Sequence, residues 1–211
     1  MSLCLMPIEK NTNPHAPKKG DSIKVEPIRN VKDIKNIKKF LADHPRNLCL
    51  FTLGINTAYR ANEILSITVG QVAHLQPGDE LDLKQSKNQK YRRVTLNESA
   101  IESIRAYLDW KQIHETQACA DDDYLFTGQR GPITVNYLNN LVKAWCKTLR
   151  LPGNFGSHTL RKTFGYQQRV LKQAPVPMLM EIFGHSTQKQ TLDYLGIQDK
   201  EIKNMFMDLN L

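Results

Sequence analysis

The sequence predicts an α+β fold that is mainly helical and carries one small antiparallel sheet. Most of the chain after residue 30 repeats apolar residues at intervals of three and four, the period of amphipathic helices. Residues 79–96 instead alternate apolar and polar residues around a polar turn, which is typical of a strand pair. At 211 residues, 40% of them hydrophobic, the chain suits one domain, or one domain with a tail.

The net charge of the chain is strongly positive. Lysine and arginine number 29 against 21 acidic residues, which gives +8. This excess favours polyanionic partners through electrostatic steering and counterion release. No apolar run approaches the ~20 residues of a membrane span, and the opening MSLCLMPIEK lacks the pattern of a secretory signal. Four widely separated cysteines show no zinc spacing, so we expect free thiols, no metal and a cytoplasmic location.

The first part of the chain is expected to form an arm followed by helices. Residues 1–26 hold several prolines and lysines without apolar periodicity, which predicts a flexible basic arm. A helix should run from Val31 to His44-Pro45, because the residue before proline avoids helical geometry. The largely apolar stretch Arg46–Tyr59 predicts a buried helix, and Ala61–Leu65 predicts another short one.

The alternating stretch predicts a hairpin with a cationic tip. Asp79–Leu83 and Arg93–Leu96 should be its strands, joined by the basic, polar turn Gln85–Lys90. A solvated tip would explain these charges without any function, whereas a neighbouring phosphate would give them one. The hairpin carries five cations, Lys84, Lys87, Lys90, Arg92 and Arg93.

The remaining chain predicts further helices around one short strand. The acidic turn Asp121–Asp123 lacks the ligand spacing of a calcium loop, so we interpret it as solvated. Gly184 is a suitable residue to end a helix. The predicted elements are a helix from Asn97, a strand at Tyr124–Phe126, and helices at Thr134–Leu149, Thr159–Gln173, Met178–Phe183, Gln188–Tyr194 and Ile197–Leu211.

The second half of the chain also holds a chemically suggestive pattern. His158 and Arg161 would share one helix face if Ser157 caps that helix. A proton-handling group beside a bidentate cation suits a phosphate. A capping-turn histidine and a surface arginine would explain the same motif without function. His185 and Tyr194 follow later in the chain. Together with His158 and Arg161, they favour a phosphate site over the explanation without function.

The whole pattern resembles the catalytic domain of the tyrosine recombinases, the phage integrase family. The resemblance rests on the segments TAYRANEIL, SHTLRKTF, IFGHS and TLDYL and runs from about Pro27 to the C-terminus. It implies a tyrosine recombinase/integrase catalytic-domain fold for residues 27–211. Family members commonly carry an N-terminal core-binding domain that grips DNA. Only the 1–26 arm precedes the matching part, so we expect that domain to be absent, whether removed or naturally missing.

The resemblance implies a site-specific recombinase that cuts and rejoins DNA through a covalent 3′-phosphotyrosine at Tyr194. Two arginines can neutralise the phosphate oxygens as charge builds up, and a tyrosine nucleophile conserves the bond energy. Neither a metal ion nor ATP or another cofactor is implied. The catalytic residues carried over by resemblance are Arg60, Lys87, His158, Arg161, His185 and Tyr194, with Glu63 in support. The residues expected to contact DNA are Lys84, Lys90, Arg92, Arg93 and Lys162.

Each residue has a role in that scheme. Arg60 and Arg161 would clamp the phosphate, His158 would handle protons, and His185 would donate a hydrogen bond to the phosphate. The hairpin lysine would protonate the leaving 5′ oxygen; it is matched to Lys87, with Lys90 as the alternative. One departure is Thr57-Ala58 before Arg60, where the family usually has Thr-Gly.

Two other functions fit the same residues. The chain could relax DNA as type IB topoisomerases do, or bind DNA as a catalytically silent regulator. Family members assemble on double-stranded DNA as tetramers by exchanging C-terminal segments, so a homotetramer on DNA and a monomer or weak oligomer without it are expected. Segment 197–211 could be exchanged or fold back, since its apolar residues Ile202, Met205, Phe206 and Leu209 suit both. A bacterial, phage or mobile-element origin is expected.

Overall fold

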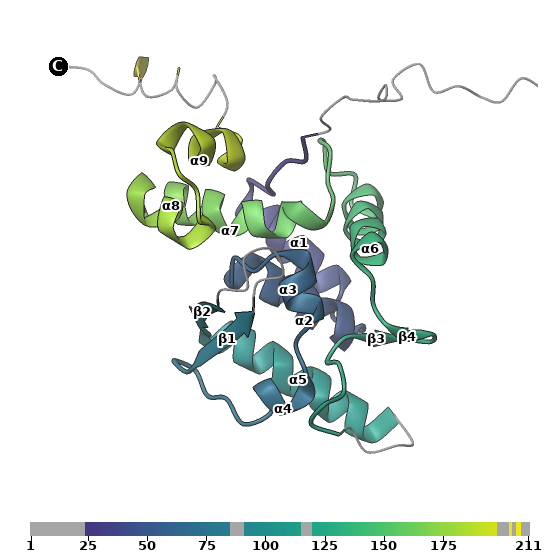
Figure 1. Ribbon diagram of the computed structural model, residues 1–211. Helices are drawn as coiled ribbons and strands as arrows, with labels where there is room; N and C mark the ends of the chain where they lie inside the picture. The colour runs from purple at the N-terminus through teal and green to yellow at the C-terminus, as the bar shows by residue number, and fades with distance from the viewer. Residues whose placement is uncertain (1–23, 85–90, 115–119, 198–202, 204–205, 208–211) are drawn as a thin grey trace, which may run out of the picture.

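The computed structural model describes residues 24–84, 91–114, 120–197, 203 and 206–207. This part of the chain is mainly helical with two short antiparallel ladders, which confirms the predicted fold class (Figure 1). None of its helices has both the length and the apolar character that crossing a bilayer requires. The elements are α1 Val31–Phe40, α2 Pro45–Asn56, α3 Ala61–Leu65, α4 Val69–Val72, β1 Glu80–Lys84, β2 Tyr91–Thr95, α5 Glu98–His114, β3 Thr127–Gly128, β4 Gly131–Pro132, α6 Val135–Thr148, α7 Ser157–Leu171, α8 Val176–Phe183 and α9 Gln188–Leu195.

The main hydrophobic core surrounds α2, which packs against both α5 and α7. Leu50, Phe51 and Leu53 of α2 are fully buried, so the prediction of a buried helix here is confirmed. Phe51 meets Trp145 of α6 edge to face, with the ring centroids 6.1 Å apart. This core fixes α3 and α7 relative to each other, and both carry candidate catalytic residues.

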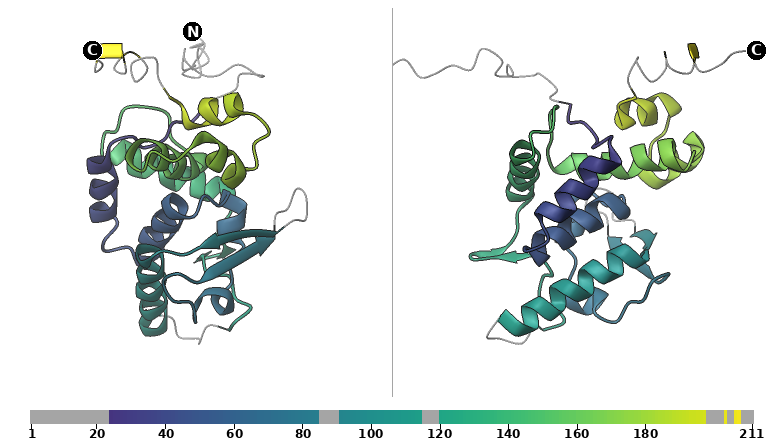
Figure 2. Two further views of the ribbon diagram at one scale, coloured as in Figure 1. Left: turned by 90° about the vertical axis from the view of Figure 1, so that its left-hand side faces the viewer. Right: turned by 180° about the vertical axis from the view of Figure 1, so that it is seen from behind.

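A second, smaller core holds α8 and α9 against one end of α7. It consists of Ala58, Leu179, Phe183 and Leu195. Figures 1 and 2 show α8 and α9 at the end of α7 that lies away from α6. Gly165 of α7 permits the close approach, because a Cβ there would lie 2.4 Å from the Phe183 ring and 2.6 Å from Leu195. The segment that carries His185 and Tyr194 is therefore held by a small hydrophobic core that is separate from the main one.

The segment before α1 crosses α7 and reaches the end of α9. The backbone N–H of Ile28 donates to Thr163 Oγ1 at 2.8 Å, and Arg29 Nη2 donates to the Gly196 carbonyl at 2.8 Å. The backbone N–H of Glu26 donates to the Asn154 carbonyl. Residues 1–23 of the predicted arm lie outside the described residues, so its flexibility stays a prediction.

Two local predictions were wrong. Tyr124–Phe126 is not a strand of a ladder: Tyr124 forms one isolated bridge with Thr68, and the ladder lies between β3 and β4. Leu125 and Phe126 are both buried, so the alternation that a one-sided strand requires is absent. Ser157 does not cap α7; Gly156 precedes the helix, and the Ser157 backbone N–H donates to Asn139 Oδ1.

Two further predictions fall partly outside the described residues. The hairpin itself is confirmed, with β1 and β2 antiparallel and Leu83 opposite Arg92, but its tip, residues 85–90, is not described. Of the apolar residues predicted for the terminal helix only Phe206 is described, and it is 78% exposed. Helix α4 was not predicted, although Thr68 and Gln71 have the spacing of a capping box, in which the Thr68 backbone N–H donates to Gln71 Oε1.

Candidate active site

Arg60 is fixed by a carboxylate from its own helix. It precedes the first residue of α3, where its backbone N–H donates to Glu63 Oε2 at 2.6 Å. Its Nη1 donates to Glu63 Oε1 at 2.8 Å. Glu63 is 2% exposed, so one buried carboxylate both caps the helix and orients the guanidinium. The contacts agree with a supporting role for Glu63, which stays a prediction.

Arg161 lies in α7 and reaches across to the end of α8. Its Nη2 donates to the Phe183 carbonyl at 3.1 Å, and its guanidinium carbon lies 4.8 Å from the centre of the Phe183 ring. The residue is 4% exposed. Burial, reinforced by the nearby cations Arg92 and Arg60, lowers the Arg161 pKa to about 10.

His185 is presented by a tight helix end. Gly184 adopts the left-handed conformation that ends α8, as the sequence predicted. The backbone N–H of His185 donates a hydrogen bond to the Met180 carbonyl. The His185 Nδ1 lies 3.0 Å from Thr191 Oγ1 of α9. Thr191 Oγ1 also lies 3.5 Å from the Thr187 carbonyl, to which it can donate its one proton; the ring proton then lies on Nδ1, whereas it lies on Nε2 if Thr191 donates to His185 instead. Burial, then the cations Arg161, Arg60 and Arg92, lower the His185 pKa, which favours the neutral ring.

Tyr194 of α9 packs within the same cluster. Its ring centre lies 5.1 Å from that of Phe183 and 5.1 Å from that of His185. Lys162 Nζ lies 5.0 Å from the centre of the Tyr194 ring. Burial raises the Tyr194 pKa, while the charge of Arg161 is the largest effect that opposes it. The phenol is therefore protonated at rest and surrounded by cations that would stabilise its anion.

His158 and Lys162 occupy the first turns of α7 in different environments. His158 is exposed on one side, and its packed surroundings followed by the charges of Arg161, Lys162 and Arg60 lower its pKa. Lys162, predicted to contact DNA, is only 8% exposed and lies over the Tyr194 ring. His158 is thus open to a ligand, whereas Lys162 acts on the site from within the fold.

Three buried polar atoms of this cluster have no well-formed hydrogen bond within the described residues. They are Arg92 Nε, Arg161 Nη1 and the Tyr194 hydroxyl; Arg161 and Tyr194 flank the Phe183 ring, and Arg161 lies close enough to Tyr194 to lower the pKa of its phenol. A buried unsatisfied donor costs about 1–3 kcal/mol, so such atoms commonly serve a ligand. Cations outnumber carboxylates here, with Glu63 as the acidic side chain among Arg60, Arg92 and Arg161. An anion that accepts hydrogen bonds, such as a phosphodiester, suits this arrangement.

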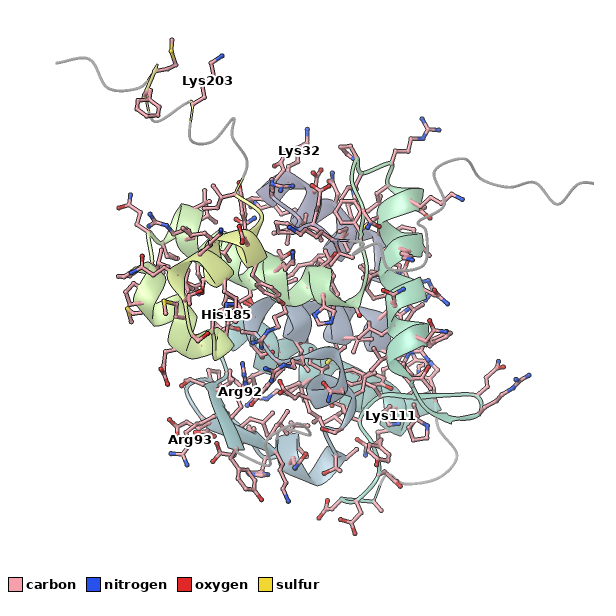
Figure 3. The ribbon with its side chains drawn as sticks, turned by 45° about the horizontal axis from the view of Figure 1, so that its top comes forward. Lys32, Arg92, Arg93, Lys111, His185 and Lys203 are labelled. Atoms are coloured by element: carbon pink, nitrogen blue, oxygen red, sulfur yellow. The ribbon has the colours of Figure 1, made fainter. Side chains whose placement is uncertain are left out.

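The hairpin cations take different positions. Lys84 is exposed at the end of β1, and Arg93 is exposed and paired with Asp82 at 2.9 Å. Arg92 turns inward beside the segment of His185 (Figure 3), and its side chain is 9% exposed. Lys87 and Lys90 lie outside the described residues, so the choice of hairpin lysine stays open.

Arg92 and Lys162, both predicted to contact DNA, are buried beside the site rather than exposed, and their contact with DNA stays a prediction. The alternation of inward and outward residues along β2 could have predicted that Arg92 points inward. Directly opposed residues of an antiparallel pair share a face, and Arg92 is opposite Leu83, which is 2% exposed. No comparable signal existed for Lys162, since its burial depends on how α9 packs against α7.

Comparison with known proteins identifies relatives over most of the chain. The model of the phage integrase family matches residues 29–201. A protein of Bacillus subtilis (strain 168) described as "Probable integrase/recombinase YoeC" is 32% identical over 180 residues, which cover 83% of this chain and 91% of that protein. "Tyrosine recombinase XerC" of Caldanaerobacter subterraneus is 26% identical over 160 residues, covering 75% of this chain but 43% of that protein.

Solved recombinase structures share the fold. The XerA recombinase aligns with a TM-score of 0.70 at 19% identity, over 87% of this chain and 65% of that one. The XerH site-specific recombinase, bound to its palindromic difH substrate in a post-cleavage complex, aligns with a TM-score of 0.67 at 22% identity, over 90% of this chain and 55% of that one. The chain thus spans little more than half to two thirds of these structures.

Proposed function

The chain belongs to the phage integrase family, and we propose that it is a site-specific DNA recombinase whose nucleophile is Tyr194. The observation that carries this proposal is the buried Tyr194 hydroxyl, which lies close enough to Arg161 for that guanidinium to lower its pKa, while neither the hydroxyl nor Arg161 Nη1 has a well-formed hydrogen bond within the described residues. An oxygen of the scissile phosphate would accept a hydrogen bond from Arg161, and the Tyr194 phenolic oxygen would attack the phosphorus. Double-stranded DNA is the proposed substrate; among the similar structures, the XerH recombinase is bound to a palindromic difH substrate and the Tn1549 integrase to a circular intermediate DNA.

The proposed reaction exchanges one phosphate ester for another. The Tyr194 oxygen attacks phosphorus, a bond from phosphorus to the phenolic oxygen forms, and the bond to the 5′ oxygen breaks. His158 takes the phenolic proton, while Lys87, or Lys90 in its place, gives a proton to the leaving 5′ oxygen. Attack by a 5′-hydroxyl reverses these steps and rejoins the strand. The balance requires neither a metal ion nor ATP.

Electrostatics would supply most of the acceleration. Arg60 and Arg161 approach the site from α3 and α7, with Arg60 oriented by Glu63 and Arg161 by the Phe183 carbonyl. Because both are held before substrate arrives, they need little reorganisation as negative charge grows on the phosphate. His185, with Nε2 protonated, would donate a further hydrogen bond to a phosphate oxygen.

Assembly is part of the proposal. We expect a homotetramer on DNA and a monomer or weak oligomer without it, with segment 197–211 as the candidate for exchange between subunits. Deleting residues 199–211 should then abolish assembly on DNA. Unchanged assembly of the truncated protein would contradict exchange and favour a segment that folds back.

The test is covalent capture on nicked suicide duplexes, which trap the adduct by losing the short leaving strand. Because the target sequence is unknown, the probe is a pool of duplexes from the DNA that flanks the gene. The intact protein should form a denaturation-resistant, metal-independent adduct, and Tyr194→Phe should bind DNA without forming one. An adduct that persists in Tyr194→Phe would refute the nucleophile. DNA binding without any adduct would favour the silent regulator, and relaxation of supercoiled plasmid without site preference would favour the topoisomerase.

A further inference from the structure

Neighbouring arginines in β2 have different surroundings. Arg93 is exposed and forms ion pairs across the hairpin with Asp82 and Glu80, at 2.9 and 3.3 Å. Arg92 points the other way, and Figure 3 shows it beside the segment of His185 while Arg93 lies at the outer side of the hairpin. Its side chain is 9% exposed. A cation this buried requires partners within the protein, since desolvation otherwise makes it costly.

The partners of Arg92 come from two other elements. Its Nη1 donates to the Ile182 carbonyl at 2.6 Å, and its Nε lies 3.9 Å from Glu63 Oε2. Ile182 is in the last turn of α8, whose final carbonyls have no partners within the helix. Arg161 donates to the next carbonyl, that of Phe183. Two arginines from β2 and α7 thus cap the helix end that leads directly into His185, where cations also suit the helix dipole.

Glu63 connects Arg92 to Arg60, one of the two arginines proposed to bind the phosphate. The same carboxylate that orients Arg60 faces the Nε of Arg92. The guanidinium of this strand residue therefore hydrogen-bonds the helix end before His185 and forms a longer ion pair, without a hydrogen bond, with the carboxylate behind Arg60. The small core of α8 and α9 packs mainly on α7, and Arg92 adds a polar contact from the side of the sheet.

We propose that Arg92 is a positioning residue, which tethers the His185–Tyr194 segment to the Arg60–Glu63 pair and to the hairpin, rather than a DNA contact. This inference rests on the recombinase function proposed above. Without the tether, the end of α8 would lose one of its two caps, and the distance from Tyr194 to the bound phosphate would vary. The chemical step should suffer, because small misplacements of reacting groups are costly, while DNA affinity should not.

The test compares Arg92→Ala and Arg92→Lys with a matched control, Arg46→Ala. Arg46 is also partly buried and donates from Nη1 to a distant carbonyl, that of Thr127 at 2.9 Å, but it joins α2 to β3 away from the cluster. Adduct formation is measured on the nicked duplex recovered from the pool, at saturating protein. DNA affinity is measured separately, and hydrogen exchange is followed across residues 176–195.

For Arg92→Ala we expect cleavage about 10- to 100-fold slower, the size of one lost charge-assisted hydrogen bond. DNA affinity should stay within about twofold, and amides of residues 176–195 should exchange faster. Arg92→Lys should recover part of the rate, because an ammonium can still donate to the Ile182 carbonyl. Arg46→Ala should change neither the cleavage rate nor exchange in this segment.

Several results would overturn the proposal. Weaker DNA binding by Arg92→Ala with normal cleavage at saturation would make Arg92 a DNA contact. Unchanged exchange across residues 176–195, or a lysine variant as slow as the alanine variant, would remove the tether. If the unaltered protein forms no adduct, the proposed function fails, and the exchange comparison between Arg92→Ala and Arg46→Ala still decides whether the tether exists.

Discussion

Substituting Gly165 by alanine should disturb the packing of α8 and α9 more than the stability of the whole domain. A Cβ at Gly165 would lie 2.4 Å from Phe183 Cζ and 2.6 Å from Leu195 Cδ2, so both side chains must move. Overpacking of this kind costs about 1–3 kcal/mol. Alanine favours the interior of a helix over glycine by about 1 kcal/mol. We therefore expect the substitution to lower the free energy of unfolding by about 0–2 kcal/mol.

The effect on cleavage should be larger than this small loss of stability suggests. Phe183 accepts a hydrogen bond from Arg161 through its carbonyl and supports that guanidinium with its ring, and Leu195 follows Tyr194 directly. Displacing both should separate the nucleophile from the clamp and slow adduct formation at least about tenfold, equivalent to about 1.4 kcal/mol in the barrier.

The assay pairs denaturant unfolding with adduct formation at saturating protein. The control is Ile104→Val in α5, a core change expected to cost about 0.5–1.5 kcal/mol at a residue that is 1% exposed and belongs to the main core. It should lose stability and retain cleavage. Equal loss of cleavage by both variants, or full cleavage by Gly165→Ala, would refute the idea that the Gly165 contact sets the position of Tyr194.

Two further predictions concern stability. Thr163→Val should destabilise the fold by about 1–3 kcal/mol, because the buried N–H of Ile28 loses its acceptor; Thr163→Ser keeps the hydroxyl and should lose less in the same denaturant titration. Stability should also fall as the pH drops below about 6.5, since the folded-state pKa values of His158 and His185 are lowered and the unfolded chain binds protons first. A His158→Gln, His185→Gln protein should lose less between pH 7.5 and 5.5, and an equal loss would contradict this reasoning.

How far the sequence could predict this site depends on whether a residue's environment is set locally or by distant packing. His158 and Arg161 share the start of α7 because of their spacing, and Gly184 ends α8 because glycine tolerates the left-handed conformation. The inward direction of Arg92 was also readable, since it opposes a buried leucine in the strand pair. The burial of Lys162 was not, because helical period defines faces but not which face a later helix covers.

Ala58 shows how the departure from the family pattern is accommodated. It adopts φ 55°, in the left-handed region where the usual glycine would be free of strain. That conformation costs an alanine roughly 1–2 kcal/mol. The methyl is fully buried in the small core with Phe183 and Leu195, which returns about 0.8 kcal/mol; the lower entropy of the unfolded chain does not outweigh the strain of an alanine at positive φ.

Burial of the methyl therefore offsets part of the strain that an alanine carries at this position. The methyl also ties two parts of the site together, because Ala58 lies two residues before Arg60 yet packs with the core that carries α8 and α9. Arg92 connects the same two parts through polar contacts with Glu63 and the end of α8. An apolar contact and a polar contact thus act between the phosphate clamp and the tyrosine segment, and the distance from Arg60 to Tyr194 should depend on both.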